Sequence, residues 1–385
     1  MSSVVSYNNP KTRALLYQIV VLAALLWLGY EFVVNARANL QAQNIGSGFG
    51  FLDNTAGFGV NQSLIPYNEA DTYSRVFLVG LLNTLLVAVL GIVLATILGF
   101  VIGIARLSPN WLIARLAGGY VELIRNLPLL LQILFWYLAV LGALPGPRQS
   151  ISLAGEIFLN NRGIIVPAPV AGAGAGAVLA AFVIGIGATV ALALWARRRQ
   201  DRTGRRLSLF WPGFFLIAGL PLAAFIAAGF PIGLERPELR GFNFVGGVRL
   251  IPEFVALLVA LTIYTAAFIA EVVRAGVLAV PRGQTEAALA LGLRRGLILR
   301  LIVVPQALRV IVPPLTNQYL NLTKNSSLAV AIGYPDLFAV FAGTALNQTG
   351  QAIEIIAITM AVYLAISLLT SAFMNWYNAR IQVTG

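Results

Sequence analysis

Long apolar runs separated by short polar stretches define the plan of the chain. Runs of about 20 apolar residues are long enough to cross about 30 Å of hydrocarbon as helices. We therefore predict an all-α membrane protein with about eight transmembrane helices. The expected spans are residues 14–34, 77–105, 120–144, 171–196, 211–230, 254–276, 301–332 and 353–376.

The composition supports a polytopic membrane protein. Of the 385 residues, 59% are hydrophobic and 10% are charged, whereas soluble domains carry about 25% charged residues. The net charge of +12 lies largely between the apolar runs, so we expect no nucleic-acid partner. The chain contains no cysteine and no histidine. We therefore expect no catalytic residue, no metal site and no disulfide.

Basic residues predict the orientation. Lys11 and Arg13 precede the first apolar run, which we interpret as an uncleaved anchor. If the spans alternate, the segments on the same side as the N-terminus hold most of the lysines and arginines, so both termini are expected in the cytoplasm. One such segment is the arginine-rich turn 197–206, which joins spans 171–196 and 211–230. We interpret this turn as an orientation signal that contacts membrane lipid.

Residues 281–305 form a polar segment, interrupted by glycines, between two spans. A turn is expected at 281–283, Thr285 is a candidate N-cap, and the helix-forming run that follows ends at Gly292. The segment predicts a short surface helix, a break and a second helix. A short exposed helix at a membrane face has the shape of a docking element.

Ionisable residues within spans predict two ion pairs. Glu122 precedes Arg125 by three positions, and Glu271 precedes Arg274 by three. Residues with this spacing are neighbours on a helix, and pairing offsets much of the cost of placing a charge in a bilayer.

Span 301–332 carries the chain's densest set of polar residues. Asn317, Asn321 and Lys324 recur at spacings of four and three, so they form one polar stripe. The opposite apolar face is expected to hold Leu315, Leu322, Leu328 and Val330. The adjacent prolines 313 and 314 predict a bend. Two roles fit the stripe: a substrate path, or contacts between helices.

Several motifs resemble one family. Glu286-Ala287-Ala288, Gly292 and the segment from Ile302 to Pro305 match the signature of permease subunits of ATP-driven (ABC) importers, with Val304 in place of the usual leucine. Around Arg274 and in Lys324-Asn325-Ser326-Ser327 the chain is similar to the polar amino-acid branch, although Asn325-Ser326 stands where many members have Asp-Thr. The size resembles the larger permease of broad-specificity L-amino-acid and glutamate/glutamine/aspartate/asparagine importers.

The resemblance implies a type I permease core of five helices, enlarged by an N-terminal helix and an inserted helical hairpin. The parts would be 1–75, an anchor helix and periplasmic loop; 76–145, the first part of the core; 146–250, periplasmic segments and the hairpin; and 251–385, the second part, with coupling loop 277–300. The implied ATPase contacts are Glu286, Ala287, Ala288, Leu291, Gly292 and Arg295. The candidate substrate path is Asn317, Asn321, Lys324, Asn325, Ser326 and Ser327.

The implied partners are a homologous permease subunit, two ATPase subunits and a periplasmic substrate-binding protein. ATP and Mg²⁺ would be bound by the ATPase, and no cofactor is expected in this chain. The chain has two lysines, Lys11 and Lys324, and neither lies in the Gly-Lys-Ser/Thr sequence of a phosphate-binding loop. The protein would thus be a multi-pass component of the bacterial inner membrane.

Two other classes remain open on the residues alone. An ion-coupled secondary transporter would use Glu122, Glu271 or Lys324 for coupling. Such transporters commonly show repeated halves, which this sequence does not. A secondary transporter would also need no ATPase-docking loop. The second class is a membrane scaffold or channel with no energy coupling.

Overall fold

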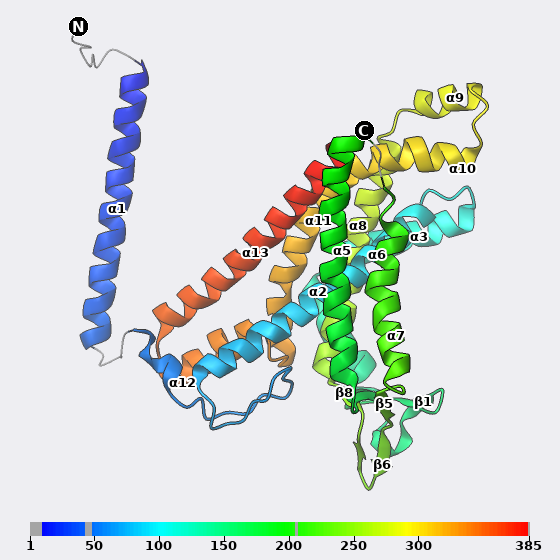
Figure 1. The fold of residues 1–385 in the computed structure, drawn as a ribbon. Helices are drawn as coiled ribbons and strands as arrows, with labels where there is room; N and C mark the ends of the chain where they lie inside the picture. The colour runs from blue at the N-terminus through cyan, green and yellow to red at the C-terminus, as the bar shows by residue number, and fades with distance from the viewer. Residues whose placement is uncertain (1–9, 43–47, 205–206, 384–385) are drawn as a thin grey trace. The chain divides into compact units, whose positions relative to one another are not determined.

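The computed structural model describes residues 10–42, 48–204 and 207–383. Within these ranges, seven helices are long and apolar enough to cross a membrane, or eight if one sharply bent pair is counted as a single span. The predicted helical membrane fold is confirmed (Figure 1). Six of these seven spans contain one long helix each, namely α1 (Pro10–Ala42), α2 (Tyr73–Ala105), α5 (Ala175–Thr203), α8 (Pro252–Leu278), α11 (Val304–Asn325) and α13 (Ala352–Val383), and the seventh covers Phe210–Ala227. The bent pair begins with α3 (Trp111–Asn126).

The chain divides into two compact units. Unit 1 comprises Met1–Leu134 with Leu257–Gly385, and unit 2 comprises Phe135–Ala256. Unit 2 is therefore inserted into the sequence of unit 1. The inserted region contains the helical hairpin that was expected from the two apolar runs at 171–196 and 211–230.

Close helix contacts build the centre of unit 1. A Cβ atom at Gly103 of α2 would lie 2.8 Å from the carbonyl oxygen of Ala270 in α8, and one at Gly276 of α8 would lie 2.3 Å from Ile311 of α11. Small residues let helices in a membrane approach this closely. α11 also packs along α13 (Figure 1). The loop between α8 and α11 is thus attached at both ends to tightly packed helices.

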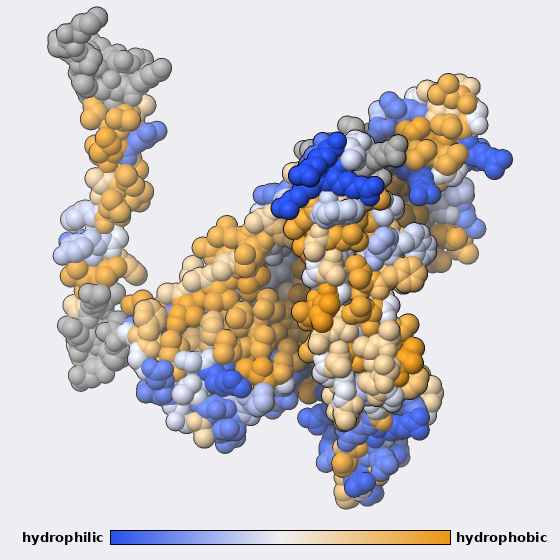
Figure 2. Space-filling model, viewed as in Figure 1, coloured by the Kyte–Doolittle hydropathy of each residue, from blue (hydrophilic) through white to orange (hydrophobic). Residues whose placement is uncertain are grey.

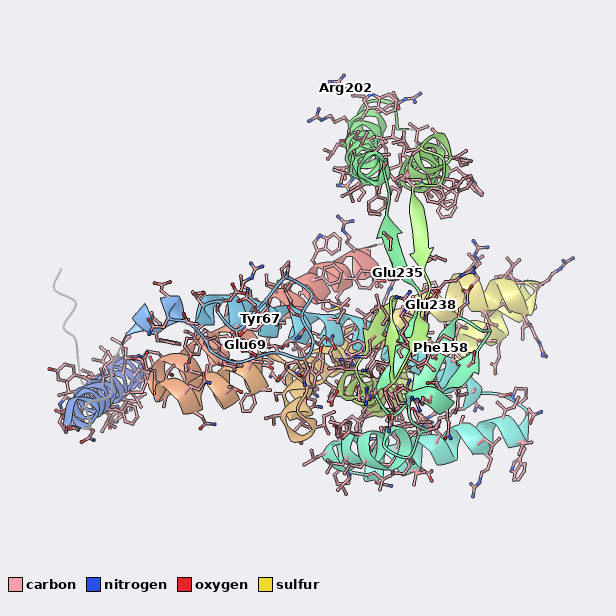
Figure 3. The ribbon with its side chains drawn as sticks, turned by 90° about the horizontal axis from the view of Figure 1, so that it is seen from below. Tyr67, Glu69, Phe158, Arg202, Glu235 and Glu238 are labelled. Atoms are coloured by element: carbon pink, nitrogen blue, oxygen red, sulfur yellow. The ribbon has the colours of Figure 1, made fainter. Side chains whose placement is uncertain are left out.

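The described part of the segment before α2, residues 48–72, packs against other parts of unit 1. It includes a 3₁₀ turn at Phe49–Asp53. Phe51 and Ala56 are buried with Val76, Phe341 and Ile355, and Figure 3 shows Tyr67 and Glu69 on this segment beside α2. The predicted extramembrane loop was expected to begin directly after the span 14–34, but residues 35–42 belong to α1. Residues 43–47 lie outside the described ranges.

The expected span 120–144 is sharply bent and not one continuous helix. α3 ends at Asn126, and a second helical piece, α4 (Leu129–Leu134) continuing as a π-helix (Phe135–Leu141), leaves at 105°. Leu127 is extended because it precedes Pro128, which disfavours helical geometry at that position. The buried Gln132 amide donates to the carbonyls of Ile124 and Leu127, both at 3.0 Å, and so satisfies two backbone groups exposed by the break.

Unit 2 combines the predicted hairpin with short strands that the sequence did not predict. α5 packs against α6 (Phe210–Phe214), a π-helical turn (Phe215–Gly219) and α7 (Leu220–Ala227). A Cβ atom at Gly185 would lie 2.1 Å from the carbonyl oxygen of Leu216, so this glycine permits the close approach. The Gly/Ala-rich residues 171–174 form the end of the strand Ala168–Ala171 and the turn into α5.

All strand pairs in unit 2 are antiparallel. One sheet has the order β1-β2-β3-β8, and β4-β5 and β6-β7 form two-stranded ribbons. Figure 3 places Phe158, Glu235 and Glu238 on this β-structure. The bounds are β1 (Ile151–Leu153), β2 (Ile157–Asn160), β3 (Gly163–Val166), β4 (Ala168–Ala171), β5 (Ile232–Glu235), β6 (Glu238–Arg240), β7 (Asn243–Val245) and β8 (Val248–Leu250).

Candidate functional site

Two short helices form a hairpin between α8 and α11. They are α9 (Arg282–Ala290) and α10 (Arg295–Ile298), followed by a π-helical turn (Leu299–Val303) that leads into α11. Figure 1 shows both helices beyond the end of α8. We refer to residues 281–298 as the coupling hairpin. The predicted order of helix, break and helix is confirmed.

The predicted N-cap of α9 is wrong. The cap is Pro281, and Thr285 lies inside the helix. Pro281 has φ −58° and an extended ψ of 133°, and its carbonyl accepts a hydrogen bond from the backbone N–H of Gln284 at 3.0 Å. The ring of proline fixes φ near this value, so the helix begins one turn earlier than a Thr285 cap would allow.

The predicted C-terminal stop at Gly292 is confirmed in detail. Gly292 has φ +74°. Its N–H donates to the carbonyl of Leu289 at 2.9 Å, and the N–H of Leu293 donates to the carbonyl of Ala288 at 3.1 Å. These two bonds define a Schellman motif, in which a left-handed residue, usually glycine, reverses the chain after a helix. Gly292 therefore sets the direction in which α10 leaves α9.

The coupling hairpin buries little and exposes much of its apolar surface. Ala288 and Ile298 are each 2% exposed and form its small interior, whereas Leu291 is 81% exposed. Ala287 is also exposed. Leu289 and Leu297 of the same hairpin are also exposed, at 46% and 43%. Several exposed apolar side chains on one small hairpin are typical of a surface that another protein covers. Only part of the expected contact set therefore faces outward, because Ala288 supports the hairpin itself.

Charged residues surround this exposed apolar surface. Glu286 and Arg295 are exposed, and neither forms an ion pair with any described residue. Arg282, Arg294 and Arg300 are also exposed. The hairpin and the turn that follows it thus present one carboxylate and several guanidinium groups in addition to the exposed Leu291, a composition suited to charge pairing at the rim of a protein contact.

One of the two predicted ion pairs is confirmed at the end of α8 that leads into the hairpin. Arg274 Nη2 lies 2.6 Å from Glu271 Oε1, and Arg106, at the end of α2, also pairs with the Glu271 carboxylate. The side chains of Arg106 and Glu271 are 16% and 28% exposed. This cluster joins α8 to the end of α2 shortly before the chain enters the coupling hairpin.

The other predicted ion pair is wrong. Glu122 and Arg125 are both exposed on α3 and make no ion pair with each other. The Arg125 guanidinium instead lies over the ring of Phe268, 5.1 Å from its centroid. A cation–π contact of this kind competes with an exposed pair that contributes little free energy. Glu122 lines a hollow of about 350 Å³ together with Arg106, Arg115 and Arg274.

The polar stripe on α11 has the predicted geometry. Asn317, Asn321 and Lys324 are all exposed, and Leu315 and Leu322 on the other face are 4% and 0% exposed. Within the described ranges, no hydrogen bond or ion pair satisfies the three polar side chains. Polar groups that face lipid are costly, so this face requires water or another protein against it.

One part of this span differs from the prediction. The two prolines at 313 and 314 lie inside α11, where a bend was predicted, and the helix continues through them. Asn325 is the last residue of α11, and Ser326–Ile332 form a 3₁₀ helix. Val330 in this 3₁₀ helix is 46% exposed, so its predicted place on the apolar face is wrong. The change of helical period after Asn325 turns Val330 out of the buried row.

The serines of the candidate path already have local partners. Ser326 is buried and its hydroxyl donates to the carbonyl of Thr323 at 2.7 Å. Ser327 donates to the carbonyl of Lys324 at 2.8 Å. These bonds hold the end of α11 and the start of the 3₁₀ helix. Only Asn317, Asn321 and Lys324 therefore present a continuous unpaired polar row within the described part of this span.

A buried carboxylate that the sequence analysis missed lies between the last two spans. Asp336 is 0% exposed. Its Oδ1 accepts a hydrogen bond from the backbone N–H of Ala339 at 2.8 Å, and its Oδ2 accepts one from the Tyr363 hydroxyl at 3.3 Å. Burial raises the pKa of Asp336 to about 7, although these hydrogen bonds oppose the shift. The Tyr334-Pro335-Asp336 sequence was the available signal.

Residues near Asp336 connect this turn to α2. Asn83 Nδ2 donates to the carbonyls of Gln62 and Pro335, each at 2.9 Å. Thr84 Oγ1 accepts a hydrogen bond from the N–H of Leu337 at 3.0 Å. The polar residues of α2 thus hold in place the segment before α2 and the turn that precedes the π-helical segment Phe338–Ala345, which continues into α12 (Leu346–Thr349).

The acidic side chains of the described residues are not clustered. In the described part of the chain, no group of three or more acidic side chains lies close enough together to hold a metal ion. The site consists of an exposed helical hairpin, an ion-paired attachment and a polar row along a spanning helix. Together with the spanning helices, these features are those expected of a component of a membrane transporter.

Comparison with known proteins gives the same class and makes it specific. Residues 240–383 match the family described as "Binding-protein-dependent transport system inner membrane component". The chain belongs to the amino-acid ABC transporter permeases. It is a multi-pass inner-membrane protein, and the family is one of transport permeases.

Three curated relatives align over nearly the whole chain. The general L-amino acid transport system permease protein AapQ of Rhizobium johnstonii is 54% identical over 97% of this chain and 94% of its own length. The putative amino-acid ABC transporter permease protein YhdX of Escherichia coli is 54% identical over 98% and 96%. The glutamate/glutamine/aspartate/asparagine transport system permease protein BztB of Rhodobacter capsulatus is 44% identical over 97% and 95%. The ion-coupled alternative finds no support among them.

Proposed function

We propose that this chain is one of two permease subunits of an importer that carries polar L-amino acids into the cytoplasm. The observation that carries the proposal is the coupling hairpin, with Leu291 81% exposed and surrounded by charged residues. The relatives' names, which include general L-amino acids and glutamate, glutamine, aspartate and asparagine, support the substrate class. We retain the division into parts 1–75, 76–145, 146–250 and 251–385 as a functional proposal.

We propose that ATP and Mg²⁺ bind in a separate ATPase subunit, two copies of which assemble with the permeases. The contact with the ATPase is made by Leu291, Ala287 and the flanking charges of Glu286 and Arg295. Ala288 and Gly292 act indirectly, because Ala288 fills the hairpin interior and Gly292 sets its turn. Movement of the hairpin then reaches α8 and α11, to which it is directly joined.

A sister permease and a periplasmic substrate-binding protein complete the proposed assembly. The polar row of Asn317, Asn321 and Lys324 requires a wet or protein-covered environment, which a path between two permease subunits supplies. In this proposal Lys324 attracts the carboxylate of the amino acid, and the two asparagine amides offer donors and acceptors to its polar groups.

Both termini are proposed to lie in the cytoplasm, with the coupling hairpin on the same side. The absence of cysteine from the chain makes this testable with single-cysteine variants. Leu291→Cys probes the hairpin, and Leu64→Cys, at a position 53% exposed before α2, is the matched control. A membrane-impermeant maleimide should label the Leu64 variant in spheroplasts and the Leu291 variant only in inverted vesicles. Labelling with the opposite sidedness would refute the orientation.

The same two variants test the proposed contact. A short bifunctional crosslinker should join Leu291→Cys to the ATPase subunit in inverted vesicles, and it should not join Leu64→Cys. The crosslink should weaken when the vesicles are stripped of the ATPase with urea and return when the ATPase is added back. A Leu291 variant that never crosslinks to the ATPase, in vesicles active for ATP-dependent uptake, would remove the hairpin from the contact.

A further inference from the structure

The turn at the end of the inserted hairpin is the most basic stretch of the chain. Arg197, Arg198, Arg199 and Arg202 lie on the last turns of α5, and Arg205 and Arg206 follow in the sequence. Asp201 is the only acidic residue among them. Nothing in the transport mechanism proposed above uses this cluster, so its charge needs a separate explanation.

The guanidinium groups of the turn are available to a ligand. Arg197, Arg198, Arg199 and Arg202 are exposed, and none forms an ion pair with a described residue. Asp201 stands four positions after Arg197 but makes no ion pair with a described residue either. Figure 3 shows Arg202 pointing away from both helices of the hairpin. The cluster thus keeps its positive charge uncompensated within the described part of the chain.

The hairpin below the turn has the surface of a lipid-immersed element. On α5, Leu179 is 66% exposed and Val183 is 61% exposed, and on the returning helices Phe215 is 63% and Leu222 is 58% exposed. Figure 2 shows this hairpin as mostly hydrophobic along its length, with hydrophilic residues at its ends. Continuous apolar exposure of this extent on a helix pair indicates contact with acyl chains.

The length of α5 places the arginines in the headgroup layer. The helix from Ala175 to Trp195 covers about 30 Å at about 1.5 Å per residue, which matches the hydrocarbon thickness. The arginines from Arg197 to Arg202 lie about 3–10 Å further along the axis. The headgroup layer on one side of a bilayer is about 5–8 Å deep. The cluster therefore lies at the level of lipid phosphates.

Exposed aromatic residues lie near this end of both helices. Trp195 is 52% exposed, and the Arg199 guanidinium lies over its ring at 5.4 Å from the centroid. On the returning helix, Phe210 and Trp211 are 69% and 62% exposed. Tryptophan prefers the boundary between acyl chains and headgroups. The rings thus provide an apolar contact directly beside the exposed guanidinium groups.

We propose that this turn is a binding site for an anionic phospholipid. Arg198, Arg199 and Arg202 bind the headgroup phosphate. Trp195 and Trp211 contact the part of the acyl chains nearest the headgroup. Guanidinium groups bind phosphate oxygens in pairs of parallel hydrogen bonds. An anionic lipid is favoured over a zwitterionic one because the several arginines exceed the charge of a single phosphate. A soluble phosphate lacks the acyl contact and binds more weakly.

The test compares two variants that remove three arginines each. Arg198, Arg199 and Arg202 are all changed to Gln in the first. In the matched control, Arg148, Arg162 and Arg249 are changed to Gln; these residues are exposed in or beside the β-structure of unit 2 and also lack a carboxylate partner among the described residues. Each full-length chain is purified in the complex in which it is expressed and is exchanged into detergent with equal amounts of phosphatidylglycerol and phosphatidylcholine of identical acyl chains. Native mass spectrometry then counts the bound lipids.

The wild-type complex should retain phosphatidylglycerol over phosphatidylcholine by at least about fivefold, since each basic residue at an anionic surface contributes roughly a factor of five. The turn variant should lose this preference and the control variant should keep it. Raising NaCl from about 0.05 to 0.5 M should reduce the wild-type preference, and inorganic phosphate at matched ionic strength should have no additional effect. If phosphate displaces the lipid, the site recognises a soluble anion and the proposal is wrong.

A wild-type complex with no preference for phosphatidylglycerol at low salt would overturn the proposal without any variant. Equal lipid retention by the turn variant and wild type would also overturn it. If the glutamine variant inserts poorly, the corresponding lysine variant keeps the charge needed for orientation, and it should retain a reduced preference because an ammonium group cannot bind phosphate in the bidentate manner. A lysine variant equal to wild type would assign the preference to charge alone and reject a guanidinium site.

Discussion

The left-handed turn at Gly292 allows a direct test of coupling. Replacing Gly292 with alanine adds a single methyl group, and no atom lies within 4 Å of the position that its Cβ would occupy. The substitution therefore changes the backbone preference and removes no contact. At φ +74°, an L-residue clashes with its own carbonyl, so alanine disfavours the turn that directs α10.

The magnitude follows from two opposing terms. A left-handed conformation costs a non-glycine residue about 1–2 kcal/mol. Alanine also lowers the conformational entropy of the open segment, which offsets about 0.4–1 kcal/mol of that cost. The net loss is about 1 kcal/mol, or about fivefold in the population of the closed turn. The hairpin buries only Ala288 and Ile298 fully, so its stability is low. The smaller population of the closed turn should therefore lower the apparent affinity of the permease for the ATPase by the same factor.

The assay is uptake by membrane vesicles stripped of the ATPase and titrated with purified ATPase subunit. Gly292→Ala should raise the ATPase concentration at half-maximal uptake by about fivefold. Gly292→Asn should restore most of the affinity, because asparagine tolerates the left-handed region. Gly296→Ala is the matched control: this glycine lies in the helix α10, and a Cβ added to it would also meet no atom within 4 Å, so the variant should behave as wild type. Equal titrations for the two alanine variants would refute the reasoning.

Three further substitutions test other parts of the site. Lys324→Ala should lower uptake of glutamate and of glutamine alike, by about tenfold, because both carry the α-carboxylate and a charge-assisted hydrogen bond contributes about 1.5–3 kcal/mol; unchanged uptake would make the polar row a helix contact. Glu271→Gln leaves the two guanidinium groups of Arg106 and Arg274 without their carboxylate, and it should reduce the free energy of unfolding by about 1–3 kcal/mol. The measurement is the melting temperature in detergent, which should fall. Glu122→Gln is the control, because Glu122 makes no ion pair with a described residue. Asp336→Asn tests a raised pKa. Because the pKa in the folded protein is about 7 and the ordinary value is 3.8, folding favours the protonated acid; its stabilisation is complete below about pH 4 and is lost as pH rises through about 7. The asparagine variant should therefore remove the decline in melting temperature between about pH 4 and 7, and an unaltered decline would assign it to another group.

The sequence predicted the parts of the molecule that local chemistry determines. Apolar runs indicated the spanning helices because only a helix satisfies its own backbone in a bilayer. Gly292 was recognised because a run of helix formers followed by glycine is a strong stop signal. Asn317, Asn321 and Lys324 were placed on one face because helical periodicity is fixed.

The errors arose where a distant contact or a backbone preference decides the structure. The bend at Leu127 follows from Pro128, but its size is set together with the Gln132 side chain, whose role depends on the fold. Glu122 and Arg125 have ion-pair spacing, yet Phe268, far along the chain, offers the guanidinium another partner. The residues that surround a side chain from elsewhere in the fold are absent from a local pattern.

The β-structure of unit 2 and the site at Asp336 show the same limit. The strands are three or four residues long, too short for an alternating pattern to stand out. β3 pairs with β8 across the whole hairpin, so its partner lies far away in sequence. Asp336 lies in an ordinary turn sequence, and only the fold shows that Tyr363 and the backbone of Ala339 enclose it.

The central claim is that energy enters this permease from a separate ATPase through the coupling hairpin. The most direct measurement is uptake of radiolabelled glutamine into proteoliposomes that contain the assembled complex, with binding protein outside and ATP inside. We predict uptake that requires ATP hydrolysis, persists when ionophores abolish all ion gradients, and shifts to higher ATPase concentration in Gly292→Ala. Uptake that continues without the ATPase and collapses with the ion gradient would contradict the claim.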